Sequence, residues 1–248
     1  MSVYTLQDSD TGEEWEENCK FDELAQLLEN NPSYRRVWKP VGFVSIHGSV
    51  MSRTDGDFRD HLKSIKKKKI PINPAVVISN KSDAKGLRIA KKMGISVEVI
   101  ESKSFKGNRT EYDKKIMNVL SDYGVTPKNG IVCLAGFMRI ISSGFVKKYK
   151  NRIINIHPAL LPAFPGLNSQ KQALDYGAKY TGCTVHFVDA GMDTGPVIIQ
   201  SVVEIKEKDT EKSLSKKILK EEHRIYPEAI NLIARKKIKV SGRKTHIS

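Results

Sequence analysis

The sequence predicts an α/β fold: a mostly parallel sheet flanked by helices, with a small αβ extension at the N-terminus. From residue 75 onward, short apolar runs alternate with longer amphipathic segments, as strands alternate with helices when successive crossovers build a parallel sheet. The first 40 residues carry 4 Lys+Arg against 9 Asp+Glu, a net charge of −5, in a chain whose net charge is +14. This contrast indicates two segments of different character.

The N-terminal extension is predicted to cover residues 1–40. Two short strands within residues 3–18 flank a turn at Asp10–Gly12, and residues 21–29 form a short helix that ends before Pro32.

Residues 41–71 are predicted to connect this extension to the main domain. They read as a strand over 41–46, a loop, and a helix over 58–68, before prolines at 71 and 74 interrupt the chain.

The main domain is predicted to span residues 72–248. In residues 110–123 the apolar positions recur at helical spacing. Residues 184–188 and 196–205 flank the turn-rich loop DAGMDTG and are expected to form a hairpin instead of another crossover. The other expected elements are strands 75–79, 96–100, 131–135 and 152–156, helices 83–93, 142–149 and 212–235, and a basic hairpin around Ser241 and Gly242.

The composition is typical of a folded protein, with 39% apolar and 28% charged residues among 248. The longest strongly apolar stretch, Ile131–Met138, is far shorter than the ~20 residues of a membrane span. The acidic N-terminus lacks the basic flank and apolar segment of a secretory signal. We therefore expect a cytoplasmic protein with no membrane partner, in the host cytoplasm if the chain is viral.

The three cysteines, Cys19, Cys133 and Cys183, are far apart and form no CxxC pair. This spacing predicts neither a disulfide framework nor a zinc site, and we expect no metal. The cysteines are expected to be buried as small apolar side chains.

The excess of basic residues raises the question of nucleic-acid binding. Lys66–Lys69 is the only dense basic run, and the other lysines are scattered without aromatic residues between them that could stack on bases. A solvated basic surface is favoured, with no specific nucleic-acid partner, and a phosphorylated or polyanionic substrate would fit it equally well.

Two polar residues stand at the end of the strand predicted over residues 152–156. Asn155 and His157 lie two positions apart before Pro158, so both side chains point to the same face. In parallel sheets, ligands bind beyond the carboxyl ends of strands. The pair is therefore a candidate site, although a histidine at a strand end can also be a hydrogen-bonded structural group.

The runs NIHPALLPAFPGLNSQKQAL and GCTVHFVDAGMDTGPVIIQ resemble the folate-dependent formyltransferases, and among them the glycinamide ribonucleotide formyltransferases of purine biosynthesis. The resemblance also takes in VVISNKSDAKGL, VCLAGFMRIIS, EEHRIYP and a closing VSGRK. So many blocks in one order are specific evidence. The resemblance implies a Rossmann-like formyltransferase fold and transfer of formyl from 10-formyltetrahydrofolate to the amine of glycinamide ribonucleotide, without a metal.

The resemblance also implies the catalytic residues, Asn155, His157 and Asp193. When an amine attacks a formyl carbon, the carbonyl oxygen becomes an oxyanion that preorganised donors must stabilise. Asn155 and His157 can supply donors, and Asp193 is expected to contact His157 and to receive the proton lost by the amine. The alternative for Asp193 is a simple turn residue.

The same resemblance implies two binding regions. The folate is expected to bind Met138, Arg139, Ile140 and Ile141 on one side, and Val188, Asp189, Ala190 and Gly191 on the other. The acceptor is expected to contact Arg109, Pro158 and Glu222. A surface ion pair is the alternative for Arg109, and a solvated helix glutamate is the alternative for Glu222. His186, between buried Val185 and Phe187, is expected to be structural.

The sequence lacks the family's GNGSN-like phosphate loop, and this leaves the acceptor open. Residues 41–71 are expected to replace the family's first βα unit, with Ser45–Ser49 as a candidate phosphate loop or an ordinary loop. The alternative functions are formyl transfer to an amino sugar nucleotide or to methionyl-tRNA, and a non-catalytic folate-binding or regulatory protein.

Residues 1–70 also resemble small phage-encoded proteins of the FmdB type, through YTLQDSDTGEEWEE, NNPSY and DGDFRDHLKSIK. The zinc-binding cysteines of the wider FmdB family are missing. The resemblance implies a viral fusion or an attachment domain. The sequence leaves the oligomeric state open, with a homodimer among the alternatives.

Overall fold

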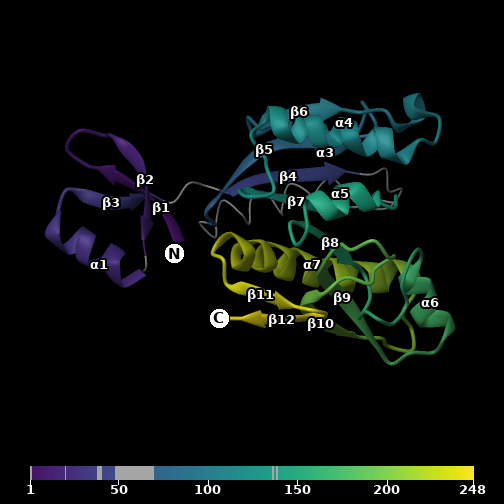
Figure 1. The fold of residues 1–248 in the computed structure, drawn as a ribbon. Coiled ribbons are helices and arrows are strands. Elements are labelled where there is room, and N and C mark those ends of the chain that lie inside the picture. The colour runs from purple at the N-terminus through teal and green to yellow at the C-terminus, as the bar shows by residue number, and fades with distance from the viewer. Residues whose placement is uncertain (1, 20, 38–40, 48–69, 136, 138) are drawn as a thin grey trace. The chain divides into compact units, whose positions relative to one another are not determined.

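The computed structural model describes residues 2–19, 21–37, 41–47, 70–135, 137 and 139–248 (Figure 1). The chain divides into two compact units, Met1–Pro40 and Val41–Ser248, and each is described by itself.

Unit 1 is a small antiparallel sheet with one helix. Its elements are β1 (Ser2–Asp8), β2 (Glu14–Cys19), α1 (Phe21–Asn30) and β3 (Tyr34–Val37), and the strand order is β2-β1-β3. Leu6 is fully buried against Trp15, Leu27 and Leu28. The two predicted strands and the helix are confirmed. The sequence did not predict β3, because YRRV is short and shows no apolar alternation.

Unit 2 contains a sheet with strand order β10-β9-β8-β7-β4-β5-β6. Strands β4 to β8 run parallel, and β9 and β10 are antiparallel additions at one edge. The mostly parallel sheet and the hairpin around DAGMDTG are confirmed. The elements are β4 (Val41–His47), β5 (Ile72–Ser79), α3 (Lys85–Lys92), β6 (Ser96–Val99), the 3₁₀ turn η1 (Ser102–Phe105), α4 (Arg109–Asp122), β7 (Gly130–Ala135), α5 (Ser143–Lys148), β8 (Ile153–His157), α6 (Ser169–Asp175), β9 (Tyr180–Phe187), β10 (Val197–Glu204), α7 (Glu211–Ala234), β11 (Ile238–Ser241) and β12 (Lys244–Ile247).

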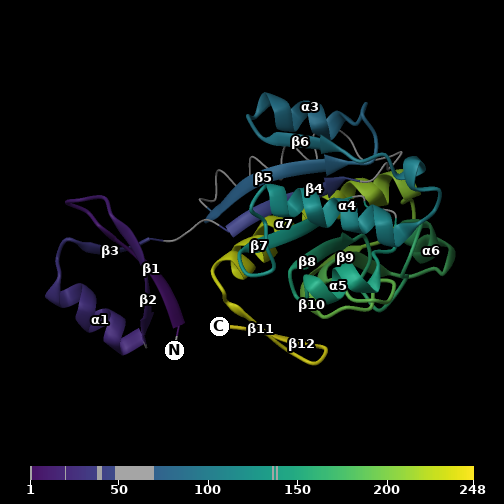
Figure 2. The same cartoon turned by 45° about the horizontal axis from the view of Figure 1, so that its top comes forward.

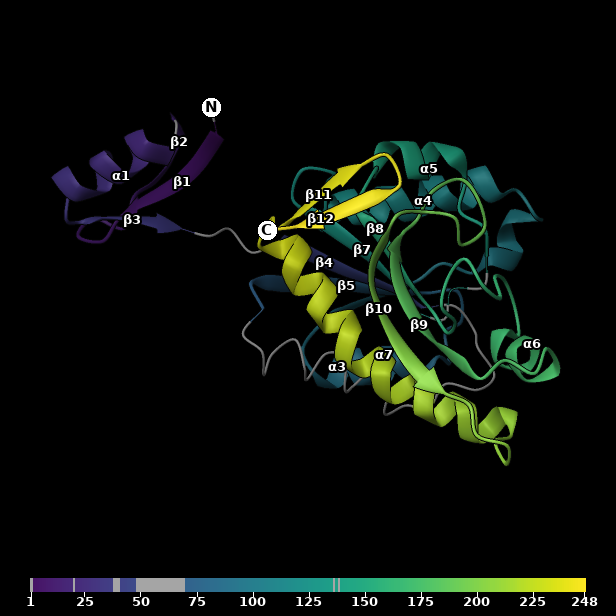
Figure 3. The same cartoon turned by 90° about the horizontal axis from the view of Figure 1, so that it is seen from below.

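Helices cover both faces of this sheet (Figures 2 and 3). Because side chains alternate across a strand, Val77 of β5 packs into the core under α3 and α7, while Val76 and Ile78 pack under α4 and α5. This two-layer burial explains why the inner strands read as continuous apolar runs. The predicted helix over 58–68 lies outside the described residues.

No helix within the described ranges combines the length and the apolar character that a membrane span requires.

The long helix α7 is fixed to the centre of the sheet by Tyr226. Its hydroxyl donates to the carbonyl of Leu134 in β7 at 2.8 Å and lies 3.4 Å from that of Ile154 in β8. A buried hydroxyl needs such partners, and here they set how the helix lies across the strands that carry the polar pair.

We expect Tyr226→Phe to lower the free energy of unfolding of unit 2 by about 1 kcal/mol, because the ring stays packed while a buried hydrogen bond is lost. Urea unfolding measures the change. Tyr176→Phe is the control, because Tyr176 is exposed. Equal midpoints for Tyr226→Phe and the wild type would contradict this role.

Candidate active site

The candidate site lies where β8 ends beside β9. In the antiparallel register Asn155 pairs with His186, and His157 pairs with Thr184. His157 is 4% exposed, and Asn155 is half-buried. Asn155 and His157 share one face of β8, as predicted. The antiparallel pairing with β9 places His186 beside Asn155 on the same face.

The loop after β9 returns Asp193 to His157. The Asp193 Oδ2 atom lies 3.3 Å from His157 Nδ1 and accepts a hydrogen bond from the Gly166 N–H at 2.9 Å. Asp193 has φ +56°, a left-handed conformation that Asp adopts more readily than most residues. The predicted contact between the carboxylate and the imidazole is present.

The second ring nitrogen of His157 also has an acceptor. Its Nε2 lies 2.8 Å from the Phe164 carbonyl oxygen. The ring therefore lies between two acceptor oxygens, the Asp193 carboxylate beside Nδ1 and the Phe164 carbonyl beside Nε2.

His186 faces the same cluster in the neutral form. Its Nδ1 donates to the Phe187 carbonyl at 2.9 Å, which leaves Nε2 to accept from Asn155 Nδ2 at 3.4 Å. Burial lowers the pKa of His186, although the Phe187 carbonyl and the Asp193 charge act in the opposite direction. The interpretation of His186 as structural fits its burial and its hydrogen bonds, and because β9 is buried on both faces its ring also lies beside Asn155 and Asp193.

Asn155 keeps hydrogen-bonding capacity to spare. Apart from the contact with His186, its side chain has no hydrogen bond to the described part of the chain. One amide N–H and the amide oxygen are therefore not used by the described residues.

The loop over residues 158–167 is anchored by β9 and β10. The buried Thr184 hydroxyl donates to the Ala159 carbonyl at 2.7 Å and accepts from the Leu161 N–H at 3.1 Å. The Gln200 amide donates to the Leu161 carbonyl at 2.9 Å. These contacts hold the loop whose Phe164 carbonyl and Gly166 N–H face the ion pair. The Phe164 carbonyl and the Gly166 N–H were missed in the sequence, because every residue carries backbone groups and no residue type marks them.

Comparison with known proteins bears directly on this site. The family model described as formyl transferase matches residues 47–230, a range that contains Asn155, His157 and Asp193. The chain belongs to the formyl transferase family.

Individual relatives cover different shares of their own length. The phosphoribosylglycinamide formyltransferase of Escherichia coli (strain K12) is 38% identical over 191 residues, which are 77% of this chain and 88% of that protein. The trifunctional purine biosynthetic protein adenosine-3 of Gallus gallus is 42% identical over 185 residues, 75% of this chain and 18% of that protein. The chain thus spans between 11% and 24% of the length of the trifunctional relatives.

The fold comparison agrees with the family. The crystal structure of glycinamide ribonucleotide transformylase 1 from Symbiobacterium toebii matches with a TM-score of 0.78 and 40% identity, over 86% of this chain and 96% of that chain. The predicted formyltransferase fold is confirmed.

The first predicted folate segment of this formyl transferase follows β7. Arg139 and Ile140 are exposed, Ile140 by 53%, while Ile141 is buried under α4 and α5. The Arg139 guanidinium lies over the Tyr112 ring, 4.9 Å from its centre. Met138 lies outside the described residues.

The second predicted folate segment follows β9. Val188 donates its N–H to the Ile153 carbonyl at 2.9 Å, and Asp189 Oδ1 accepts from the Gly191 N–H at 3.1 Å and from Thr194 Oγ1 at 2.6 Å. Ala190 and Gly191 are exposed. This turn leads directly to Asp193, so a ligand bound along it would lie beside the ion pair.

The predicted acceptor residues are more widely spread. Pro158 follows His157, and its carbonyl accepts from Ser169 Oγ at 3.2 Å. Arg109 is exposed at the first turn of α4. Glu222 is 2% exposed in α7, so the solvated-glutamate alternative is wrong. Of Ser45–Ser49, residues 45–47 end β4, and residues 48 and 49 lie outside the described residues.

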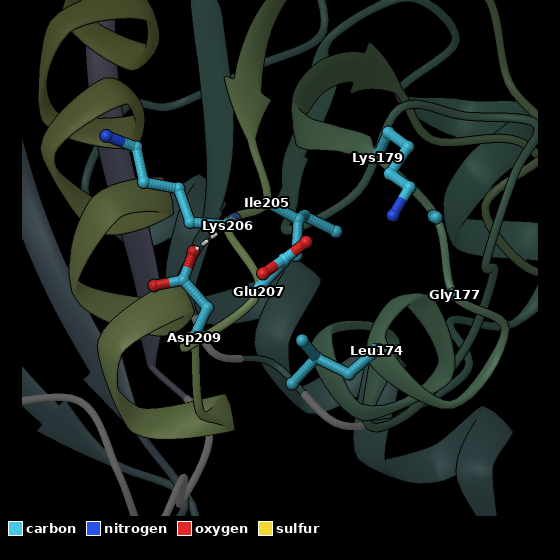
Figure 4. A pocket seen from close by; sticks show the side chains of 8 residues that line it. Leu174, Gly177, Lys179, Ile205, Lys206, Glu207 and Asp209 are labelled. Carbon is cyan, nitrogen blue, oxygen red and sulfur yellow. Dashed lines mark hydrogen bonds between the residues drawn. The ribbon is translucent and has the colours of Figure 1, made fainter.

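A small hollow lies where the α6–β9 loop meets the β10–α7 loop (Figure 4). Its volume of about 170 Å³ is below the ~300 Å³ at which ligand pockets usually begin, and none of the predicted site residues lines it. A hydrogen bond from Lys217 lowers the pKa of Asp209 at its rim to about 2, assisted by the Lys206 N–H and the Ser213 hydroxyl. The lining residues are Leu174, Gly177, Ala178, Lys179, Ile205, Lys206, Glu207 and Asp209.

Cys133 and Cys183 are fully buried, as predicted, and burial raises the pKa of the Cys133 thiol. The side chain of Cys19 lies outside the described residues. Over the ranges that the structure describes, no group of His, Cys, Asp or Glu gathers as metal ligands would.

The lowered pKa of His186 predicts a pH dependence of stability. As the pH falls below about 6.5, the unfolded chain binds a proton at this residue before the folded chain does, so stability is lost on acidification. We expect the melting temperature of His186→Gln to fall less between about pH 7.5 and pH 5.5 than that of the wild type.

Thermal unfolding over this pH range measures the difference. His246→Gln is the control, because His246 is exposed in the C-terminal hairpin. Parallel curves for His186→Gln and the wild type would rule out a buried neutral His186.

Proposed function

We propose that the chain transfers the formyl group of 10-formyltetrahydrofolate to the amine of glycinamide ribonucleotide. The observation that carries this proposal is the cluster of Asn155, His157 and Asp193, with 3.3 Å between His157 Nδ1 and Asp193 Oδ2. Relatives named phosphoribosylglycinamide formyltransferase support this choice of acceptor.

In the proposed reaction, the acceptor amine attacks the formyl carbon and forms a new C–N bond. The carbonyl oxygen becomes an oxyanion, and the intermediate collapses by breaking the bond between the formyl carbon and N10 of the folate. The amine loses a proton and N10 gains one. Asp193 accepts the proton from the amine, directly or through water, and the proton reaches N10 by the same route.

Asn155 and the charge of His157 stabilise the oxyanion. The amide of Asn155 has an N–H that is not used by the described residues, and it donates without a change of charge. The Nε2–H of His157 is engaged by the Phe164 carbonyl at 2.8 Å.

We assign the folate donor to residues 138–141, which precede β8, and to residues 188–191, which lead into Asp193. We assign the acceptor to the carboxyl ends of β4 and β7, with Arg109, Pro158 and Glu222 as contacts. From β4 the chain adds β5 and β6 on one side and then returns to add β7 on the other side. The strand order therefore reverses between β4 and β7, and open α/β sheets bind ligands at such a reversal.

In this proposal residues 72–248 are the transferase domain, residues 41–71 replace the family's first βα unit, and residues 1–40 are an added αβ unit. The reaction uses no metal. We place it in the cytoplasm, that of a host if the N-terminal resemblance to phage proteins reflects the source, with no nucleic-acid or membrane partner.

A different acceptor is the second candidate, favoured by the absence of a GNGSN-like loop. An amino sugar nucleotide or methionyl-tRNA would use the same donor and the same cluster. A non-catalytic folate-binding protein would have no use for the His157–Asp193 pair.

An acceptor assay separates these functions. Purified protein is given 10-formyltetrahydrofolate with glycinamide ribonucleotide, an amino sugar nucleotide, charged methionyl-tRNA or water. We expect formylated glycinamide ribonucleotide as the dominant product. Dominance of another acceptor would overturn the assignment, and folate binding without any product would favour the non-catalytic alternative.

We expect His157→Ala to lower kcat by roughly 10²-fold or more, because it removes the charge that faces the oxyanion. Asp193→Asn should also lower kcat, since it removes the carboxylate but leaves an oxygen for the Gly166 N–H. Asp175→Asn, at an exposed ion pair with Lys171 in α6, is the control. An unchanged kcat in His157→Ala would exclude His157 from the mechanism.

A further inference from the structure

A buried carboxylate on α4 has no part in the reaction described above. Asp113 is 1% exposed, in a helix face that otherwise buries Tyr112, Ile116, Val119 and Leu120. Burying a charge is costly unless the charge is hydrogen-bonded, and an apolar side chain would continue this buried helix face at a lower cost. A carboxylate at this position therefore needs a hydrogen-bond donor as its partner.

That partner is the backbone at the end of the first folate segment. The Ser142 N–H donates to Asp113 Oδ2 at 2.6 Å, the short distance of a charge-assisted hydrogen bond. Ser142 is also the N-cap of α5, where its hydroxyl accepts from the Phe145 N–H. Asp113 thus fixes the point at which the segment passes into α5.

The neighbouring residue Tyr112 holds the exposed part of the same segment. Its buried ring meets Phe105 edge-on, with 5.4 Å between ring centres, and the Arg139 guanidinium lies over it at 4.9 Å. A cation over an aromatic ring is an attractive contact. Between these two fixed points Ile141 is buried and Ile140 is exposed.

We propose that Asp113 and Tyr112 are positioning residues that set the affinity for the folate donor. They fix the segment 139–142 at both ends, so that Arg139 and Ile140 are presented to the folate without a large ordering cost on binding. The proposal rests on the proposed function, since it takes residues 138–141 as a wall of the folate site.

Steady-state kinetics of the full chain test this role. We expect Asp113→Ala to raise KM for 10-formyltetrahydrofolate roughly 10-fold, equivalent to about 1.4 kcal/mol, with little change in kcat or in KM for glycinamide ribonucleotide. Asp113→Asn should restore most of the affinity, because an amide oxygen can still accept from the Ser142 N–H.

Tyr112 gives an independent pair of variants in case Asp113→Ala does not fold. Tyr112→Leu should raise the same KM several-fold because it removes the ring under Arg139, whereas Tyr112→Phe should not, since phenylalanine also accepts a cation over its face. Thr210→Ala is the control. It removes the N-cap hydroxyl of α7, which accepts a hydrogen bond from the Ser213 N–H at 3.2 Å, and it does not alter the segment 139–142.

Calorimetric titration with tetrahydrofolate, without acceptor, separates this proposal from the proposed function. Weaker binding in Asp113→Ala and Tyr112→Leu supports the positioning role even if glycinamide ribonucleotide proves not to be the acceptor. The proposal is overturned if these variants lose melting temperature as Thr210→Ala does while folate KM and affinity stay at wild-type values. It is equally overturned if wild-type protein binds no tetrahydrofolate.

Discussion

The pairing of His157 with Asp193 is the interaction on which the arrangement of this formyl transferase depends. Both side chains are largely withdrawn from water, and a buried ion pair is stable only if its remaining hydrogen-bonding groups are also satisfied. The Phe164 carbonyl and the Gly166 N–H meet this need. The loop over residues 158–167 must therefore keep a fixed backbone position, and Thr184 and Gln200 hold it through backbone groups of Ala159 and Leu161.

Much of the fold could be predicted, because its determinants are local. The alternation of short apolar runs with amphipathic segments predicted the strands and helices of unit 2. The turn-rich DAGMDTG string predicted a hairpin at that point instead of another crossover. The strand β3 and the turn η1 were missed because each has only four residues, too few for a repeating apolar pattern to show. Within the site, the shared face of Asn155 and His157 followed from strand geometry, whereas the contact of Asp193 with His157 came only from family resemblance.

The residues that were missed differ in physical cause. His186 lies in a strand that is buried on both faces, so a polar residue that alternation would send to solvent meets the loop of Asp193 instead. Asp113 lies on the one buried face of α4, where a carboxylate is not expected among apolar side chains. Phe164 and Gly166 act through backbone groups, which are present at every position. Sequence patterns report burial on one face, and they do not report which element covers the other.

The hydrogen bonds and burial of His186 explain how the Asp193 carboxylate can serve His157 alone. His186 Nε2 lies 3.7 Å from Asp193 Oδ1, close enough that a protonated His186 would compete with His157 for the same charge. Burial lowers the pKa of His186, and the hydrogen bond from its Nδ1 to the Phe187 carbonyl leaves Nε2 as an acceptor. The ring then orients the Asn155 amide without adding charge. The Asp193 carboxylate is thereby left to the His157 ring, which the proposed mechanism places beside the developing oxyanion.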